Sequence, residues 1–214
     1  MEIKRGVIIS GGDIADFFEF KKDDIIICAD RGYEFAAAKG IVPFAVIGDF
    51  DSTSTLPEAG IKRITHPSEK DETDTLLALM YLEKMGIKEV HIICALGGER
   101  FDHAFANLLL LKYAADCGME AFVEDEHTRI FLIKDNAVLT DNSKYISVFP
   151  VFGDAEGVSI KGTKYPLENG FLTAGDTIGI SNEKIAKKAE ISLKKGTLMI
   201  MEIKKCGDEK NVRI

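Results

Sequence analysis

Residues 46–53 of this 214-residue chain read Val-Ile-Gly-Asp-Phe-Asp-Ser-Thr. The apolar run 44–47 is typical of a short buried strand, and it stops at a glycine that is followed by Asp49 and Asp51. Mg²⁺ takes oxygen ligands, commonly one or two carboxylates together with substrate phosphates, so two carboxylates at a strand end predict a metal site. The alternative is an ordinary turn, because Asp and Ser side chains bond their own backbone.

Three other apolar runs in the first half of the chain end in a similar way. These runs and the residues that follow them are 6–10 before Gly11-Gly12-Asp13, 24–29 before Asp30-Arg31-Gly32, and 89–95 before Gly97-Gly98. Helical stretches are expected at 14–20, 33–39, 73–85 and 103–117. Apolar strands that alternate with helices predict an α/β domain with a mostly parallel sheet, covered on both faces. Ligands of such sheets bind beyond the carboxyl ends of the strands, where these clusters should meet.

The pattern changes near residue 126, and no helical segment of any length follows residue 128. Short strand-like runs separated by turn residues are found at 129–133, 137–140, 145–149, 157–161, 177–181, 189–193 and 197–203. Fairly even spacing of short strands predicts an all-β sandwich or a small barrel. We therefore expect an α/β domain over residues 1–125 and an all-β C-terminal domain over residues 126–214.

Composition and charge exclude several classes of partner. The net charge is −8, and an acidic chain is a poor candidate for binding nucleic acid, which is led by Lys and Arg. No apolar run approaches the roughly 18 residues that a membrane span requires, and no signal-peptide pattern opens the chain. The four cysteines form no zinc-binding spacing, and Cys28 and Cys94 sit in apolar runs. Buried free thiols of this kind suit a reducing cytoplasm.

Familiar phosphate-binding loops are missing, and one motif suggests a different enzyme. The chain has neither a Walker A sequence nor GxGxxG, so phosphates would be bound by metal, helix N-termini and Arg. Residues 49–53 match DxDxT, the nucleophile motif of haloacid dehalogenase phosphatases, in which the first Asp attacks phosphorus. That motif normally closes the first strand of its fold, whereas here it follows the third apolar run. A magnesium-dependent phosphohydrolase is therefore the alternative function. A non-catalytic nucleotide sensor is a third, although so many carboxylates near phosphates argue against passive binding.

Taken together, the motifs resemble those of the thiamine pyrophosphokinases, in order and over nearly the whole chain. The matching pieces are residues 29–32, 47–52, 71–74, 97–103 with Asn107, 162–167 and 179–183. One departure is Asp30-Arg31-Gly32, where the family often has Asp-Gly-Gly. The resemblance implies an N-terminal α/β domain, a C-terminal β-sandwich and a homodimer. It also implies a reaction in which thiamine and ATP give thiamine diphosphate and AMP.

The resemblance implies particular residues for the phosphate end of the site. Mg²⁺ ligands would be Asp49 and Asp51, completed by Asp74 and by Asp71. The alternative for the last two is helix capping, because they stand three apart as in a capping box. The catalytic set is Asp49, Asp51, Asp74, Arg100 and Asp102, and the nucleotide-binding set is Asp30, Gly32, Gly97, Gly98, Arg100, His103 and Asn107. Arg100 suits a phosphate fork at a helix start, and Asp102 is expected to be the N-cap of that helix as well as a site residue.

The resemblance also implies residues for thiamine in the all-β domain. Tyr165 would stack on the substrate ring, which is sensible beside a cationic thiazolium or a flat pyrimidine. Ser181 and Asn182 would hydrogen-bond the aminopyrimidine, with Ser159 as a further candidate. In the family these residues reach the α/β domain of the partner subunit, so the dimer would complete the site. The alternative for Tyr165 is a surface or core tyrosine of the sheet.

Overall fold

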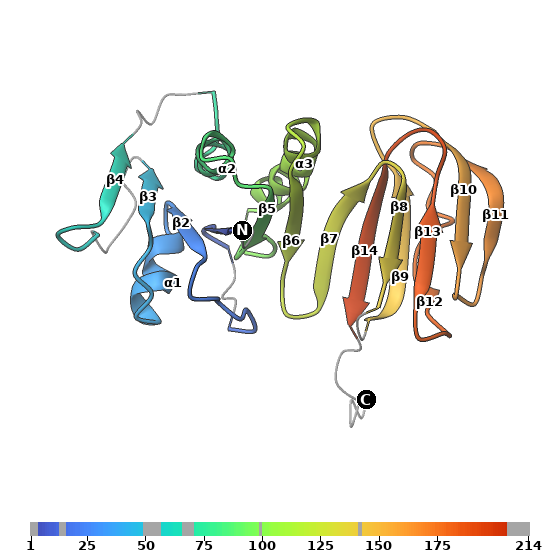
Figure 1. Cartoon of the computed structure of the whole chain (residues 1–214), viewed down its shortest axis with the longest axis horizontal. Helices are drawn as coiled ribbons and strands as arrows, with labels where there is room; N and C mark the ends of the chain where they lie inside the picture. Colours follow the sequence, from blue (N-terminus) through green and yellow to red (C-terminus); the bar gives the residue numbers. More distant parts are fainter. Residues whose placement is uncertain are drawn as a thin grey trace. The chain divides into compact units, whose positions relative to one another are not determined.

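The computed structural model describes residues 4–12, 16–48, 57–65, 71–98, 100–140 and 143–204. Asp49 and Asp51 lie outside the described residues. The chain divides into two compact units, Met1–Glu126 and His127–Ile214, whose elements are labelled in Figure 1. In the described part of the chain, no helix is long and apolar enough to cross a membrane.

The first unit alternates strands and helices. Its elements are β1 (Arg5–Ile9), β2 (Ile25–Ala29), α1 (Gly32–Ala38), β3 (Ala45–Gly48), β4 (Lys62–Thr65), α2 (Asp74–Lys84), β5 (Glu89–Ile93), α3 (Phe101–Asp116) and β6 (Glu120–Glu124). The strand order is β6-β5-β1-β2-β3-β4, and each neighbouring pair in it is parallel. Because the strands are parallel, their carboxyl ends share one edge of the sheet.

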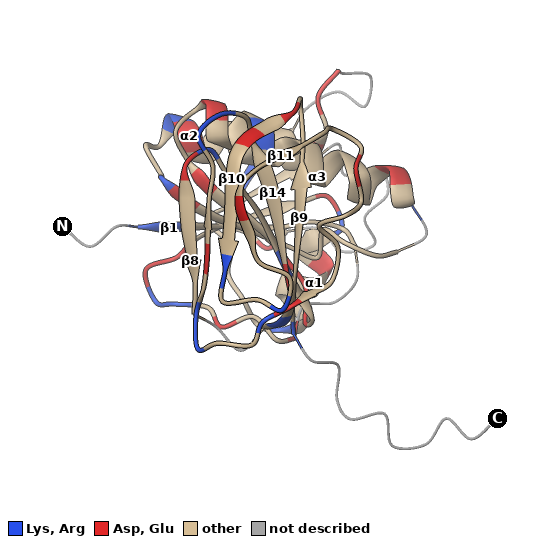
Figure 2. Ribbon diagram, turned by 90° about the vertical axis from the view of Figure 1, so that its right-hand side faces the viewer, with Lys and Arg blue, Asp and Glu red and all other residues tan. Residues whose placement is uncertain are grey.

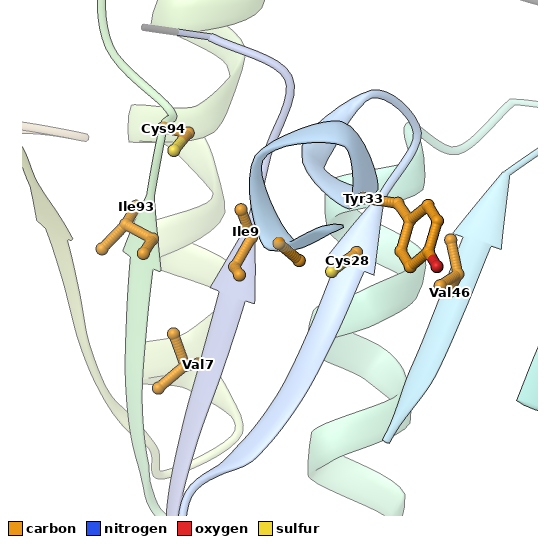
Figure 3. Close-up of a cluster of buried hydrophobic side chains, with 8 residues drawn as sticks. Val7, Ile9, Cys28, Tyr33, Val46, Ile93 and Cys94 are labelled. Atoms are coloured by element: carbon orange, nitrogen blue, oxygen red, sulfur yellow. The ribbon is translucent and has the colours of Figure 1, made fainter. Parts of the chain in front are cut away.

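Helices cover both faces of this sheet. On one face, Val7, Ile9, Cys28, Val46 and Ile93 form a buried cluster with side chains of α1, drawn in Figure 3. On the other face α2 packs closely, because a Cβ placed on Gly6 of β1 would lie 2.6 Å from Leu82 Cδ1. Successive strand residues point to opposite faces, so strands buried on both sides must be apolar throughout. This burial explains the unbroken Ile and Val runs of the sequence.

The second unit is built from strands. They are β7 (Thr128–Ile133), β8 (Asn136–Leu139), β9 (Ser143–Pro150), β10 (Ala155–Lys161), β11 (Leu167–Leu172), β12 (Asn182–Glu183), β13 (Ala189–Ser192) and β14 (Leu198–Lys204). Antiparallel pairing gives the orders β12-β9-β14-β7 and β11-β10-β13-β8. Figures 1 and 2 show β10 and β11 in a layer beside β9 and β14. Buried side chains such as Val148, Ile200, Val158 and Ile191 come from both layers, as in a sandwich.

Three expectations about the elements are corrected. The larger sheet is mixed rather than mostly parallel, with parallel pairs in the first unit and antiparallel pairs in the second, beside a separate antiparallel sheet. The expected helix 14–20 is absent over residues 16–20, where Phe17, Phe18 and Phe20 pack against the buried cluster of Figure 3. Three aromatic side chains turned toward one core within four positions do not follow a helical stripe.

The third correction concerns the approach to β12. The expected strand 177–181 is a turn, in which Ile180 N donates to Thr177 O at 3.2 Å and Val148 N donates to Gly179 O at 3.0 Å. The structure instead has β11 at Leu167–Leu172, which was not expected. Its Asn169 and Gly170 are typical turn residues, and a register shift in its pairing with β10 accommodates them.

Candidate active site

The segments that follow β2 and β5 carry unusual backbone conformations. Asp30 and Cys94 have φ of 48° and 53°, and Gly97 and Gly98 have φ of 76° and 77°. Positive φ is uncommon for residues other than glycine and is concentrated at functional sites. The chain therefore turns sharply as it leaves β2 and β5, at the edge where the sequence predicts a ligand site.

Asp30 lies beside the stretch that holds the predicted metal ligands. Its backbone N–H donates to Ile47 O at 2.9 Å, and a Cβ placed on Gly48 would lie 2.6 Å from Asp30 Oδ1. The Asp30 carboxylate thus covers the residue that directly precedes Asp49. Arg31, where the family often has glycine, is the N-cap residue of α1, and its Nε lies 3.7 Å from Glu34 Oε2. This exposed side chain is directed toward α1.

Glycines allow the strand ends to approach one another. A Cβ on Gly32 would lie 1.9 Å from Ile9 O, so α1 can begin this close to β1 only with glycine at that position. Gly12 N donates to Cys94 O at 2.6 Å and joins the segment after β1 to the end of β5. The predicted role of Gly32 in nucleotide binding is accompanied here by a packing requirement.

At the start of α2, the helix cap is made by a residue other than the two predicted carboxylates, Asp71 and Asp74. The N-cap is Thr73, whose Oγ1 accepts from Leu76 N at 3.2 Å. The capping interpretation of Asp71 and Asp74 is therefore wrong, and Asp74 is the first residue of the helix. Ser10 Oγ lies 3.1 Å from Thr75 Oγ1, so the first turn of α2 is joined to the end of β1. A negative charge there is favoured by the helix dipole.

The start of α3 presents an ion pair. Arg100 Nε donates to Asp102 Oδ1 at 2.9 Å and Nη2 donates to Oδ2 at 2.7 Å. The helix has Arg100 as its N-cap residue with no side-chain cap, so the expected capping role of Asp102 is wrong. The hydrogen bonds from Arg100 lower the pKa of Asp102 to about 2, and the same pair raises the pKa of Arg100. Nη1 of the guanidinium takes no part in the pair.

Asn107 and His103 differ in their surroundings although both lie on α3. Asn107 is buried, and its Nδ2 donates to Ala95 O at 2.9 Å. It therefore holds the segment that leads into Gly97 and Gly98. His103 is exposed, and its backbone N–H donates to Arg100 O at 3.0 Å.

The contact between Ser10 and Thr75 was not expected, although Ser10 itself ends an apolar run that was singled out.

In the second unit, the structure brings three of the four predicted thiamine residues together. Asn182 of β12 bonds the backbone of Tyr165, and Ser181 precedes it with φ of 54°. The Ser181 N–H donates to Ser147 Oγ at 3.0 Å, a partner that the sequence did not suggest. Ser159 lies on β10 in the other sheet, where its Oγ accepts from Asn169 N at 3.0 Å.

Comparison with known proteins places these motifs in one family. The model "Thiamin pyrophosphokinase, catalytic domain" matches residues 19–123, and "Thiamin pyrophosphokinase, vitamin B1 binding domain" matches residues 131–198. A thiamine pyrophosphokinase from Bacillus subtilis is 31% identical over 207 residues, which cover 91% of this chain and 96% of that protein. The chain belongs to the thiamine pyrophosphokinase family.

Solved structures of thiamine pyrophosphokinases share the fold over nearly the whole chain. The crystal structure of the Bacillus subtilis enzyme has a TM-score of 0.86 at 27% identity, covering 95% of this chain and 100% of that one. The Geobacillus thermodenitrificans structure has a TM-score of 0.82 at 27% identity, covering 95% and 99%. The resemblance inferred from the motifs is confirmed, and the haloacid dehalogenase alternative finds no support.

The thiamine pyrophosphokinase motifs imply Mg²⁺, and the side chains at this edge of the sheet can be compared with the ligands that this ion prefers. Over the described ranges, which omit Asp49 and Asp51, no three His, Cys, Asp or Glu side chains are grouped to hold a metal ion. Asp30 and Asp74 nevertheless lie at the same sheet edge, at the end of β2 and at the start of α2. Carboxylate oxygens are the donors that Mg²⁺ prefers, so the chemistry of these residues fits that ion.

Proposed function

We propose that this enzyme transfers the pyrophosphoryl group of ATP to the hydroxyl of thiamine, giving thiamine diphosphate and AMP. The observation that carries the proposal is the match to thiamine pyrophosphokinases across both units. In the transfer, the thiamine oxygen forms a bond to the β-phosphorus, and the bond from that phosphorus to the oxygen of AMP breaks. The hydroxyl proton is lost, and no covalent enzyme intermediate is required.

The α/β domain, residues 1–125, binds metal and nucleotide in this proposal. Asp49, Asp51, Asp74 and Asp71 hold Mg²⁺, which would offset negative charge on the phosphates when bound. Support comes from Asp30, whose carboxylate covers Gly48, and from the capping of α2 by Thr73 rather than by either aspartate.

Arg100 binds a phosphate through the edge of its guanidinium that Asp102 leaves open. Asp102 bonds Nε and Nη2, so Nη1 is directed away from the pair and suits a phosphate oxygen. His103 contacts the nucleotide from the exposed side of the same helix turn. Asn107 supports the segment that contains the proposed nucleotide-binding residues Gly97 and Gly98, because its hydrogen bond to Ala95 O fixes the chain just before them.

The β-sandwich, residues 126–214, binds thiamine and forms the dimer. Tyr165 is 66% exposed, and its ring can stack on a flat cationic ring. Ser181 is exposed next to it, while the hydroxyl of Ser159 already accepts a hydrogen bond from Asn169. These contacts favour Tyr165 and Ser181 as the residues that touch thiamine.

A homodimer with sites at the subunit interface is supported by exposed apolar side chains on both units. Helix α3 exposes Phe101, Phe105 and Leu109, which are four residues apart and therefore share one face. The second unit exposes Tyr165, Ile178, Ile180 and Ile185. Large exposed apolar groups mark surfaces that associate. The cytoplasm is the proposed compartment, in keeping with free thiols at Cys28, Cys94 and Cys117.

The test is one reaction containing the purified protein, ATP, Mg²⁺ and thiamine, resolved by chromatography and ³¹P NMR. We expect equal amounts of AMP and thiamine diphosphate, both lost with EDTA and in Asp49→Asn. Asp116→Asn is the matched control, because Asp116 ends α3 and pairs with Lys112 on the surface. Release of orthophosphate without thiamine diphosphate would overturn the proposal and favour the phosphohydrolase.

A further inference from the structure

The side-chain amide of Asn182 is fully engaged inside the second unit. Its Oδ1 accepts from Tyr165 N at 3.0 Å, and its Nδ2 donates to Tyr165 O at 2.7 Å and to Thr163 Oγ1 at 3.1 Å. An asparagine amide has two N–H donors, and both are used here. Asn182 and Thr163 are only 7% and 3% exposed. Asn182 therefore has no donor to offer a ligand.

The amide takes the place of a strand partner for Tyr165. Residues 162–166 connect β10 to β11. The backbone bonds between this connection and the segment that contains β12 lie before Tyr165, where Lys164 N donates to Glu183 O at 2.8 Å and Ile185 N donates to Gly162 O at 3.0 Å. At Tyr165 the Asn182 side chain bonds both the N–H and the C=O. Two bonds to one residue fix the orientation of its backbone and hence the direction of its side chain.

Thr163 determines which way the amide is turned. Its Oγ1 accepts from Asn182 Nδ2 and donates to Tyr165 O at 3.4 Å. With the hydroxyl proton directed at that carbonyl, the hydroxyl oxygen favours the NH₂ end of Asn182 on its side. The result is a buried support of two polar side chains beneath an exposed aromatic ring.

We propose that Asn182 is a positioning residue, which holds Tyr165 so that its ring faces thiamine, rather than a residue that contacts thiamine. This inference rests on the proposed function, because it assigns Tyr165 to the thiamine site. Thr163 belongs to the same support. Removing either residue should loosen Tyr165 and weaken thiamine binding while the metal and nucleotide residues are unaffected.

A double-mutant cycle tests whether Asn182 acts through Tyr165. The full-length variants Asn182→Ala, Tyr165→Ala and the double variant are assayed for kcat and for the KM of thiamine and of ATP. We expect each single variant to raise the KM for thiamine about three- to tenfold, the loss of one aromatic stack, with kcat and the KM for ATP nearly unchanged. The double variant should be no worse than Tyr165→Ala, because residues that act through one another are not additive.

Ser181→Ala provides a matched comparison, because Ser181 is the exposed neighbour of Asn182. Its effect should multiply with that of Tyr165→Ala, as expected of an independent contact. If Asn182→Ala also multiplies, Asn182 contacts thiamine directly and the inference is overturned. In a variant whose circular dichroism matches wild type, a fall in kcat together with a higher KM for ATP would also overturn it, since Asn182 would then act on more than the Tyr165 ring.

A folding defect would not end the test. If circular dichroism shows that Asn182→Ala is unfolded, Asn182→Asp and Thr163→Val replace it in the same cycle, because each removes only part of the support. The wild-type protein is assayed first. If the wild type makes no thiamine diphosphate, the proposed function fails. Multiplicative effects in an active enzyme remove only the positioning role.

Discussion

Arg100 and Asp102 form an ion pair that stays intact across the physiological pH range. The pKa of Asp102 is lowered from 3.8 to about 2, first by hydrogen bonds from Arg100 and then by its charge. A lowered pKa means that the pairing is present above 3.8 and is lost as the pH falls through about 2. We expect Arg100→Gln to return the titration midpoint of Asp102 toward 3.8, measured by carbon NMR of the carboxyl group.

Carboxyl groups in residues 127–214 serve as internal controls in that titration and should be the same in both proteins. An unchanged Asp102 midpoint in Arg100→Gln would show that the guanidinium does not bind this carboxylate in solution. The guanidinium would then lack the orientation that we propose for phosphate binding.

Gly48 lies next to the proposed metal site, and Asp30 leaves little room for a side chain at this position. A methyl group added there would lie 2.6 Å from Asp30 Oδ1, so the carboxylate must move. We expect Gly48→Ala to lower kcat/KM by about tenfold or more, because small displacements of site groups are costly. The free energy of unfolding should change by less than about 1 kcal/mol, because a side-chain carboxylate can move aside.

Substitutions at two other glycines serve as comparisons for Gly48→Ala. Gly40 has φ of 66° and open space around it, so Gly40→Ala should cost about 1 kcal/mol in urea unfolding and leave activity unchanged. Gly32→Ala should prevent normal folding, because its methyl would meet the backbone oxygen of Ile9 at 1.9 Å. Equal activity of Gly48→Ala and wild type would place Asp30 outside the working site.

At the level of elements, different residues at the start of α2 should stabilise the helix and serve the proposed metal site. Thr73 caps the helix through Leu76 N, so Thr73→Ala should lower the free energy of unfolding by about 1 kcal/mol in urea titration. Thr73→Ser keeps the hydroxyl and should retain most of that stability. Asp71→Ala should stay within about 0.5 kcal/mol of wild type, because Asp71 is exposed and is not the cap. A loss in Asp71→Ala as large as in Thr73→Ala would contradict this assignment.

At the level of the whole molecule, a shared site predicts complementation between two impaired chains. Asp49→Asn disables the α/β domain, and Tyr165→Ala raises the KM for thiamine, so activity is compared at thiamine concentrations well below KM. If each site combines the α/β domain of one subunit with the sandwich of the other, a mixed dimer has one site with neither substitution. Random mixing after denaturation and refolding should then restore about a quarter of the wild-type activity.

The control is each variant refolded alone, which should keep its own low activity. Sedimentation analysis of both variants and of the mixture checks that dimers form in every sample. Activity of the mixture equal to the mean of the two variants would show that each site lies within one chain.

Much of the architecture follows from local patterns. Unbroken Ile and Val runs predicted β1, β2, β3 and β5, because strands buried on both faces must be apolar at every position. The ordered set of motifs, from these strand ends to the second half of the chain, pointed to the family. The same patterns failed for β11, where Asn169 and Gly170 indicate a turn, and for residues 16–20, where a helix was expected. In both segments, packing against distant residues outweighs local preference.

The roles of individual polar side chains depended on the tertiary structure. Asn107 and Asn182 both stand in motifs that resemble binding sites, yet each is buried and bonds a backbone carbonyl 12 or 17 residues away in sequence. Asp71 and Asp74 have the spacing of a capping box, yet Thr73 makes the cap. Residue type and spacing determined the fold class, the family and the edge of the sheet where its chemistry gathers. Only folding decided which side chains support the site and which face a ligand, because a hydrogen-bond partner is chosen by proximity in space.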